Sequence, residues 1–168
     1  NDDEAFAACK RLSDFCWQTT PKGNADPDRN FSYSLVSQPW ILSLDDDEWL
    51  PEETQKFISR VILSKAEVVW FKFSNLIDGV DVHDILGDDP HPRLWRKIDG
   101  IIQWPNAAHQ FPQIASPKQY FTDNKFIHDR TYEDILKRHE ERVKVIDPQN
   151  QELEKRFITA VKQKLGKK

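Results

Sequence analysis

The sequence contains no methionine among its 168 residues, not even at position 1. Residue 1 is therefore not a native translation start, and we expect that further sequence precedes it in the natural protein. Glycine is scarce, with five residues in the whole chain. Neither the glycine-rich loop of a P-loop site nor the dinucleotide-binding fingerprint of a Rossmann fold can be built from so few.

Cysteine is also scarce, with only Cys9 and Cys16. Both fall within one predicted helix, where their spacing corresponds to about 10 Å along the axis, too far for an undistorted disulfide. Two isolated thiols suit a reducing compartment, so we predict a cytoplasmic location. The chain has no signal-peptide pattern and no apolar run near the roughly 18–20 residues of a membrane span.

The composition favours one water-facing domain over residues 1–168. Hydrophobic residues make up only 38% of the chain, but aromatic residues reach 11% and can supply a core. A net charge of −4 argues against a general nucleic-acid-binding protein, which normally has a basic surface. The sequence also lacks the Cys and His spacing of a zinc site and the Gly-x-Ser-x-Gly motif of a serine hydrolase.

Helical and strand patterns alternate along residues 1–104, which predicts an α/β core. A helix is expected to begin at Pro51, where a missing N–H is harmless. Residues 93–97 and 101–104 are expected to form a hairpin, and residues 105–127 to be irregular before the C-terminal helices. The other predicted helices cover residues 2–17, 30–36, 132–143 and a segment after 148, and the other strands cover 39–44 and 67–73.

Four consecutive acids, Asp45 to Glu48, directly follow the apolar run that ends at Leu44. Ligands of open α/β sheets bind beyond the carboxyl ends of strands. Carboxylates this close repel one another unless a cation or strong hydrogen-bond donors offset their charge. Mg²⁺ and Mn²⁺ prefer oxygen ligands and commonly also bind substrate phosphates. The pattern therefore indicates a diphosphate–metal site, with a solvated acidic loop before the next helix as the alternative.

The acidic run resembles the Asp-x-Asp motif of the family 2 glycosyltransferases, which have the GT-A fold. Other stretches resemble the family in the same order, over roughly residues 26–145. Arg29-Asn30 precedes the acids, and Leu50-Pro51-Glu52-Glu53 follows them. Further along come Arg93-Leu94-Trp95-Arg96, Trp104, His109 and His128.

The resemblance implies a metal-dependent transfer of a sugar from a nucleoside-diphosphate sugar to an acceptor hydroxyl, with inversion. Its metal, Mn²⁺ or Mg²⁺, would be held by Asp45, Asp47 and His109. Arg29, Asn30, Arg93 and Arg96 are the candidate residues for binding the donor. The fold implied is a mixed sheet flanked by helices, with helices at the C-terminus.

Two departures from the family pattern stand out. The family's first strands, which hold the nucleobase and ribose, should precede residue 1, so we expect an incomplete sheet whose edge an upstream segment or a partner chain covers. Gln110 stands where many relatives have a glutamate, and an amide cannot take the acceptor's proton. Residues 74–92, earlier in the chain, are predicted to be an acid-rich loop. The candidate bases are the acids of this loop, chiefly Asp84, Asp88 and Asp89, with Asp78 and Asp81 as further candidates.

Two other functions remain open at this point. A binding or structural module on a glycosyltransferase-like scaffold would account for Gln110 and for the missing strands. A metal-dependent nuclease or phosphatase would use the same acids, but the negative net charge counts against it.

Overall fold

The computed structural model describes residues 2–13, 16, 26–87, 90–105, 112–143 and 148–167. Contacts between Cα atoms divide the chain into two compact units. The first combines Asn1–Ser37 with Ile98–Ala115, and the second combines Gln38–Lys97 with Ser116–Lys168. In the described residues, no helix combines the length and the apolar character needed to cross a membrane.

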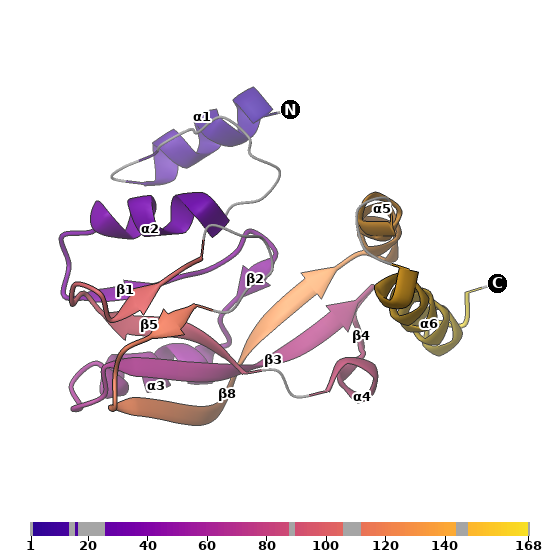
Figure 1. Ribbon diagram of the computed structural model, residues 1–168. Coiled ribbons are helices and arrows are strands. Elements are labelled where there is room, and N and C mark those ends of the chain that lie inside the picture. The colour runs from indigo at the N-terminus through magenta and orange to yellow at the C-terminus, as the bar shows by residue number, and fades with distance from the viewer. Residues whose placement is uncertain are drawn as a thin grey trace. The chain divides into compact units, whose positions relative to one another are not determined.

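Among the described residues, the first unit contains the helices α1 and α2, labelled in Figure 1, and a pair of short strands. Asn30 joins helix to strand pair, because its side-chain amide donates to the Trp104 carbonyl at 2.8 Å and its oxygen accepts from the Trp104 N–H at 2.9 Å. The elements of this unit are α1 (Asp2–Leu12), α2 (Asp26–Ser34), β6 (Ile102–Gln103) and β7 (Gln113–Ile114), with β6 and β7 antiparallel.

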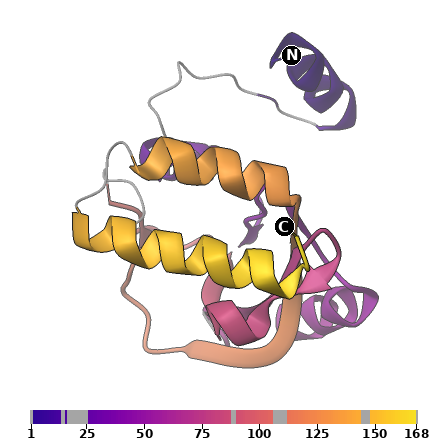
Figure 2. The same ribbon diagram turned by 90° about the vertical axis from the view of Figure 1, so that its right-hand side faces the viewer.

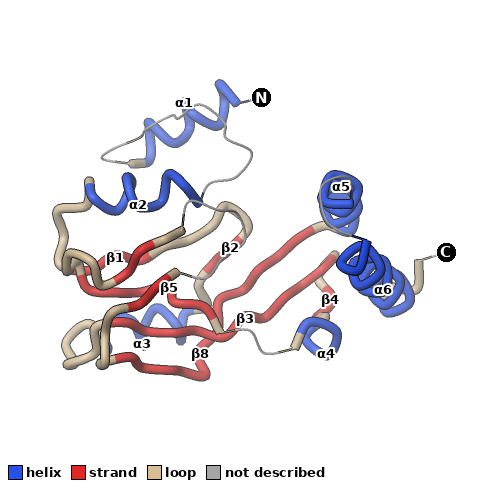
Figure 3. The backbone as a smooth tube through the Cα atoms, in the orientation of Figure 1, coloured by secondary structure: helices blue, strands red, loops and turns tan. Residues whose placement is uncertain are grey.

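The second unit is built on a six-stranded mixed sheet, shown in red in Figure 3. The strand order is β1-β5-β3-β8-β2, with β4 paired to β3. Only β3 and β8 run parallel, and every other pair in this sheet is antiparallel. The strands are β1 (Trp40–Leu42), β2 (Glu48–Trp49), β3 (Val68–Ile77), β4 (Val80–Asp81), β5 (His91–Arg96) and β8 (Gln119–Arg130).

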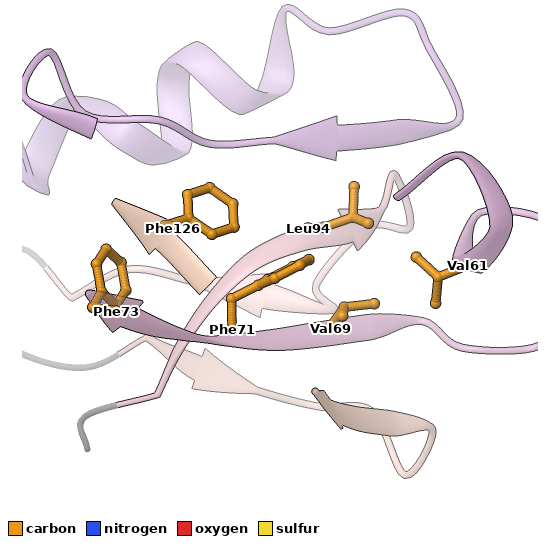
Figure 4. Packing of buried hydrophobic residues seen from close by; sticks show 6 residues of the cluster. All are labelled: Val61, Val69, Phe71, Phe73, Leu94 and Phe126. Atoms are coloured by element: carbon orange, nitrogen blue, oxygen red, sulfur yellow. The ribbon is translucent and has the colours of Figure 1, made fainter. Parts of the chain in front are cut away.

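Helix α3 (Glu52–Val61) covers one face of this sheet. Pro51 caps its start, and Glu52 and Glu53 occupy its first turn, where the helix dipole favours acids. Val61 packs with the sheet residues Val69, Phe71, Phe73, Leu94 and Phe126 to form the first core (Figure 4). The rings of Phe71 and Phe126 meet edge to face, 4.7 Å apart. The predicted helix beginning around Pro51 is therefore confirmed.

A second core lies where β3 ends and the C-terminal helices begin. Ile77 and Val82 pack with Tyr132 and Ile135 of α5 (Tyr132–Val143) and with Val161 of α6 (Pro148–Lys164). Figure 2 shows α5 and α6 side by side. The short helix α4 (His83–Leu86) contacts both β3 and α6. The chain is thus α/β, with a mixed sheet and C-terminal helices, as predicted.

Two predictions about the middle of the chain are wrong. Residues 93–97 do not pair with 101–104, because β5 lies between β1 and β3 while β6 pairs with β7. Residues 105–127 are not wholly irregular either, since β8 begins at Gln119. Asp123 and Asn124 resemble a turn, but they lie in a bulge where Thr122 Oγ1 accepts from the Asn124 backbone at 3.1 Å. The strand resumes beyond this bulge.

Candidate functional site

The acidic run forms a tight turn between β1 and β2. Ser43 extends the ladder of β1 by donating its N–H to the Arg93 carbonyl at 2.9 Å. Two hydrogen bonds then close the turn on itself. The Glu48 N–H donates to the Asp45 carbonyl at 3.2 Å, and the Asp45 N–H donates to Glu48 Oε2 at 3.1 Å. The ends of the acidic run are therefore fixed against each other.

Arg93 of β5 lies beneath this turn and is almost fully buried. Its Nη2 donates to Asp45 Oδ2 at 3.0 Å and forms an ion pair with Glu48, whose side chain is only 1% exposed. The guanidinium carbon also lies 5.3 Å from the centre of the Phe73 ring. Burial raises the pKa of Glu48, and the neighbouring Arg93 charge offsets only part of that effect. Arg93 thus offsets the negative charges of Asp45 and Glu48.

Asp47 faces different partners, on β8. Arg130 Nε donates to Asp47 Oδ2 at 2.8 Å, and the Asp129 N–H donates to the Asp47 carbonyl at 3.0 Å. His128 Nε2 lies 3.1 Å from the same carboxylate oxygen, without the angle of a hydrogen bond. Burial alone would raise the pKa of Asp47, but Arg130 and His128 together hold it below its ordinary value. Asp47 is therefore an ionised carboxylate at neutral pH.

His128 connects this ion pair to the central strand. Its Nδ1 lies 3.0 Å from Oδ1 of Asn75 on β3, and its ring is 6.0 Å from that of Phe73. Burial lowers the pKa of His128, the positive charge of Arg130 lowers it further, and Asp47 opposes both effects. The lowered pKa leaves the imidazole neutral at pH 7, so Arg130 is the cation that pairs with Asp47.

The four acids consequently divide into separate groups. Asp45 and Glu48 pair with Arg93, whereas Asp47 pairs with Arg130. Asp46 has no side-chain partner among the described residues and is exposed. The protein itself thus supplies strong donors to three of the four adjacent carboxylates. The predicted metal ligands Asp45 and Asp47 face different arginines.

A pocket of about 530 Å³ opens beside Asp46 and Asp47. It lies at the ends of β3 and β8, next to the start of α5. Asp78, with a positive φ of 49°, and Gly79 form the turn on one side of it. Its polar lining includes Asp46, Asp47, Asp78, Asp129, Arg130 and Asp134. Five carboxylates around one arginine make this an anionic cavity suited to a cation or to a polar hydroxylated ligand.

Besides Asp47, two further carboxylates of this pocket are already held by the protein. Asp78 accepts the Tyr132 N–H at 3.0 Å and pairs with Lys167 at 2.7 Å. The hydrogen bonds from Lys167 and Tyr132 lower its pKa. Asp134 accepts the Thr131 hydroxyl at 2.6 Å, and Thr131 Oγ1 in turn caps α5 by accepting the Asp134 N–H at 3.1 Å. Asp129 differs, because its carboxylate has no partner among the described residues. Asp129 and Asp46 are therefore the acids of this pocket that a ligand can engage without breaking a described contact.

The remaining predicted donor-binding residues have other contacts. Arg29 and Asn30 belong to the first unit, where Arg29 lies 4.7 Å from the Trp104 ring and Asn30 bonds the Trp104 backbone. Arg96 donates to the carbonyls of Ala66 at 3.0 Å and Ser64 at 2.8 Å. Its guanidinium carbon also lies 4.6 Å from the Trp40 ring. In the structure, Arg29, Asn30 and Arg96 therefore contact backbone groups and tryptophan rings.

The predicted bases are only partly described. Asp84 lies on α4, is exposed, and pairs with Lys164 of α6; it does not line the acidic pocket. Its pKa is lowered by the hydrogen bond from Lys164. Asp88, Asp89 and the predicted metal ligand His109 lie outside the described residues. Their roles therefore stay predictions.

Sequence reasoning missed Asn75, Asp129 and Arg130. Each lies on a strand segment that was predicted to be loop-like or was not assigned, so nothing placed it beside Asp47. A weak signal was present, since residues 126–130 read Phe-Ile-His-Asp-Arg directly before the helix cap Thr131.

In the described part of the chain, no group of three or more His, Cys, Asp or Glu side chains is arranged to hold a metal ion. No protein-family model matches the sequence, and no curated protein is significantly similar to it. Comparison therefore assigns no family, and the function has to be argued from the acidic turn and its pocket.

Proposed function

We propose that the chain acts as a metal-dependent glycosyltransferase, moving a sugar from a nucleoside-diphosphate sugar to an acceptor hydroxyl. The observation that carries the proposal is the turn after β1, because it directs Asp46 and Asp47 into a 530 Å³ pocket with Asp129 and Arg130. A carboxylate turn at the end of a strand, next to an arginine, is chemically suited to a diphosphate and its counterion.

The position of β1 adds support. This strand stands at one end of the strand order, with only β5 beside it among the described residues. The resemblance to family 2 glycosyltransferases implies further strands on that side, which hold the nucleobase and ribose. An upstream segment or a partner chain paired with β1 would complete the donor site under this proposal.

The residues present suit a hard divalent ion of the substrate-bound kind. Mg²⁺ commonly binds through one or two carboxylates, and phosphates and water complete its shell. Asp46 and Asp47 offer such oxygens from adjacent positions, and Asp47 is held ionised by Arg130. When bound, the ion would neutralise the charge of the leaving diphosphate.

The other residues receive roles from their contacts. Arg130 fixes Asp47 through Nε, and its guanidinium lines the pocket where a phosphate would lie. Asp129 is our candidate for the carboxylate that takes the acceptor's proton, because it lines the same pocket and has no described partner. His128, which contacts Asn75, lies beside Asp47 without adding charge.

The alternative is a binding or structural module without turnover. The observation favouring it is that Asp45, Asp47 and Glu48 all pair with arginines of the chain. In that case the acidic turn holds β1, β5 and β8 together, and the pocket binds a ligand without transferring a sugar.

Thermal unfolding with Mn²⁺ and either UDP or GDP separates the two functions. Under the transferase proposal, the ion and nucleotide together stabilise the protein by about 2.7 kcal/mol at 100-fold excess over the dissociation constant. Asp46→Asn and Asp47→Asn abolish this response, whereas the exposed Asp99→Asn in the first unit keeps it. Manganese-dependent hydrolysis or transfer of a sugar nucleotide completes the case. A wild-type protein that shows neither stabilisation nor turnover contradicts it.

A further inference from the structure

A second pocket lies in the second unit and is lined by other residues than the acidic pocket. It has a volume of about 700 Å³ and lies between the end of α3 and the start of β8. Its apolar surface comes from Phe57, Val61 and Ala66, with Tyr120 as a wall. The rings of Phe57 and Tyr120 stack with centres 6.0 Å apart and planes inclined by 29°. Two aromatic rings therefore line the apolar side of the pocket.

The polar lining of this pocket is basic. Arg60, Lys65 and Lys118 contribute to it, and no acidic residue does. Lys118 pairs at 2.6 Å with Glu67, which lies outside the lining. Arg60 and Lys65 have no ionic partner within the described ranges of the chain. Two unpaired cations thus border an apolar surface in a protein whose net charge is negative.

The end of α3 does not cancel this positive charge. The last carbonyls of a helix carry partial negative charge when they lack partners. Here the Arg60 carbonyl accepts from Leu63 at 3.2 Å and the Val61 carbonyl accepts from Ser64 at 2.9 Å. The Ser64 carbonyl accepts from Arg96. An anion beside Lys65 therefore meets side-chain cations rather than free carbonyl oxygens.

We propose that this pocket binds a small amphiphile with a flat, aromatic body and a phosphate group. The body would lie against Phe57 and Tyr120, and the phosphate would contact Arg60 and Lys65. A phosphate matches two neighbouring cations in charge. The site goes beyond the proposed transferase function, because it shares no lining residue with the acidic pocket. The two lie at opposite ends of β8.

Calorimetric titration of the full chain with 1-naphthyl phosphate tests the proposal. We expect binding that is at least tenfold tighter than that of 1-naphthol, which lacks the charge, or of inorganic phosphate, which lacks the body. Raising the salt concentration weakens binding, because the cations are exposed and screened. Absence of binding at millimolar concentration, or equal binding of 1-naphthol, overturns the proposal.

Variants locate the site. Arg60→Ala combined with Lys65→Ala should weaken 1-naphthyl phosphate binding at least tenfold, and Lys65→Gln alone should weaken it measurably. Lys56→Ala is the matched control, because Lys56 lies on the same helix but pairs with Glu52 and does not line the pocket. Unchanged affinity in the folded double variant, or an equal loss in the control, shows that the ligand binds elsewhere.

Discussion

Arg93 is the residue on which the acidic turn depends most directly. The side chains of Arg93 and Glu48 are 7% and 1% exposed. Their ion pair therefore offsets the free-energy cost of removing each charge from water. Removing one member of a buried ion pair leaves the other charge uncompensated, at a cost of about 3–5 kcal/mol. Arg93 therefore stabilises the fold whether or not it also meets a phosphate.

We predict that Arg93→Met lowers the free energy of unfolding by about 3–5 kcal/mol, measured by urea denaturation. Combining it with Glu48→Met should recover a large part of that loss, because no buried charge then lacks a partner on that side. The exposed Arg60→Met serves as a control and should change stability by less than about 0.5 kcal/mol. A loss below 1 kcal/mol in the single variant would contradict this account.

His128 gives the protein a pH-dependent stability. Its pKa in the folded protein lies below the ordinary 6.5, because burial and Arg130 disfavour the charged ring. The unfolded chain therefore binds a proton at this position at a higher pH than the folded chain does. Linkage then requires the free energy of unfolding to fall as the pH drops through 6.5.

We predict that His128→Gln reduces this pH dependence. Urea denaturation at pH 7.5 and at pH 5.5 should show a smaller loss of stability on acidification in the variant than in the wild type. Asp47 acts in a separate and more acidic window, because its lowered pKa makes its contribution disappear only below about pH 4. If the free energy of unfolding changed equally with pH in both proteins, His128 would not be the cause of the pH dependence.

At the scale of the elements, β3 carries the core. Phe71 is fully buried between α3 and β8, whereas Phe121 on the neighbouring strand is 61% exposed. Phe71 contacts Phe57 as well as Phe126, with ring centres 5.9 Å and 4.7 Å away. The same residue type thus occurs on adjacent strands in opposite environments.

We predict that Phe71→Ala lowers the free energy of unfolding by about 3–5 kcal/mol, through lost burial and the cavity left behind. Phe121→Ala should cost about 1 kcal/mol or less, because only its stacking on Trp70 is lost. Chemical denaturation of the two variants side by side measures the contrast. Similar losses would mean that Phe121 is covered in solution.

The elements also show where sequence reasoning works. Helix α3 and the first part of β3 were predictable, because apolar residues at helical spacing and a β-branched run each bury one continuous surface. Strand β8 was not, since it buries only Phe126 fully and bulges at Asp123 and Asn124, which resemble a turn. The acids of the turn were singled out from the sequence as a candidate site, but their arginine partners come from strands far along the chain.

At the scale of the whole molecule, the two units have separate stabilising contacts. The first depends on the paired hydrogen bonds between Asn30 and the Trp104 backbone. The second has two cores of its own. Local opening of one unit is therefore expected to leave the other protected.

We predict that Asn30→Ala accelerates amide hydrogen exchange about thirtyfold in residues 26–34 and 101–105, because two hydrogen bonds worth about 1 kcal/mol each are lost. Exchange in β3 and β8 should not change. Mass spectrometry of peptides from the two regions provides the measurement. Equal acceleration in β3 would show that the units open together.

The pairing of Asp47 with Arg130 joins positions 83 residues apart, and that of Asp45 with Arg93 joins positions 48 apart. During synthesis, the acidic turn leaves the ribosome long before the strand that neutralises it. At a synthesis rate of about 5–20 residues per second, Arg130 is added several seconds after Asp47. Until then its carboxylate faces water, and the nascent chain carries an exposed acidic loop on an unfinished sheet. The order of synthesis thus makes this turn one of the last parts of the protein to reach its final contacts.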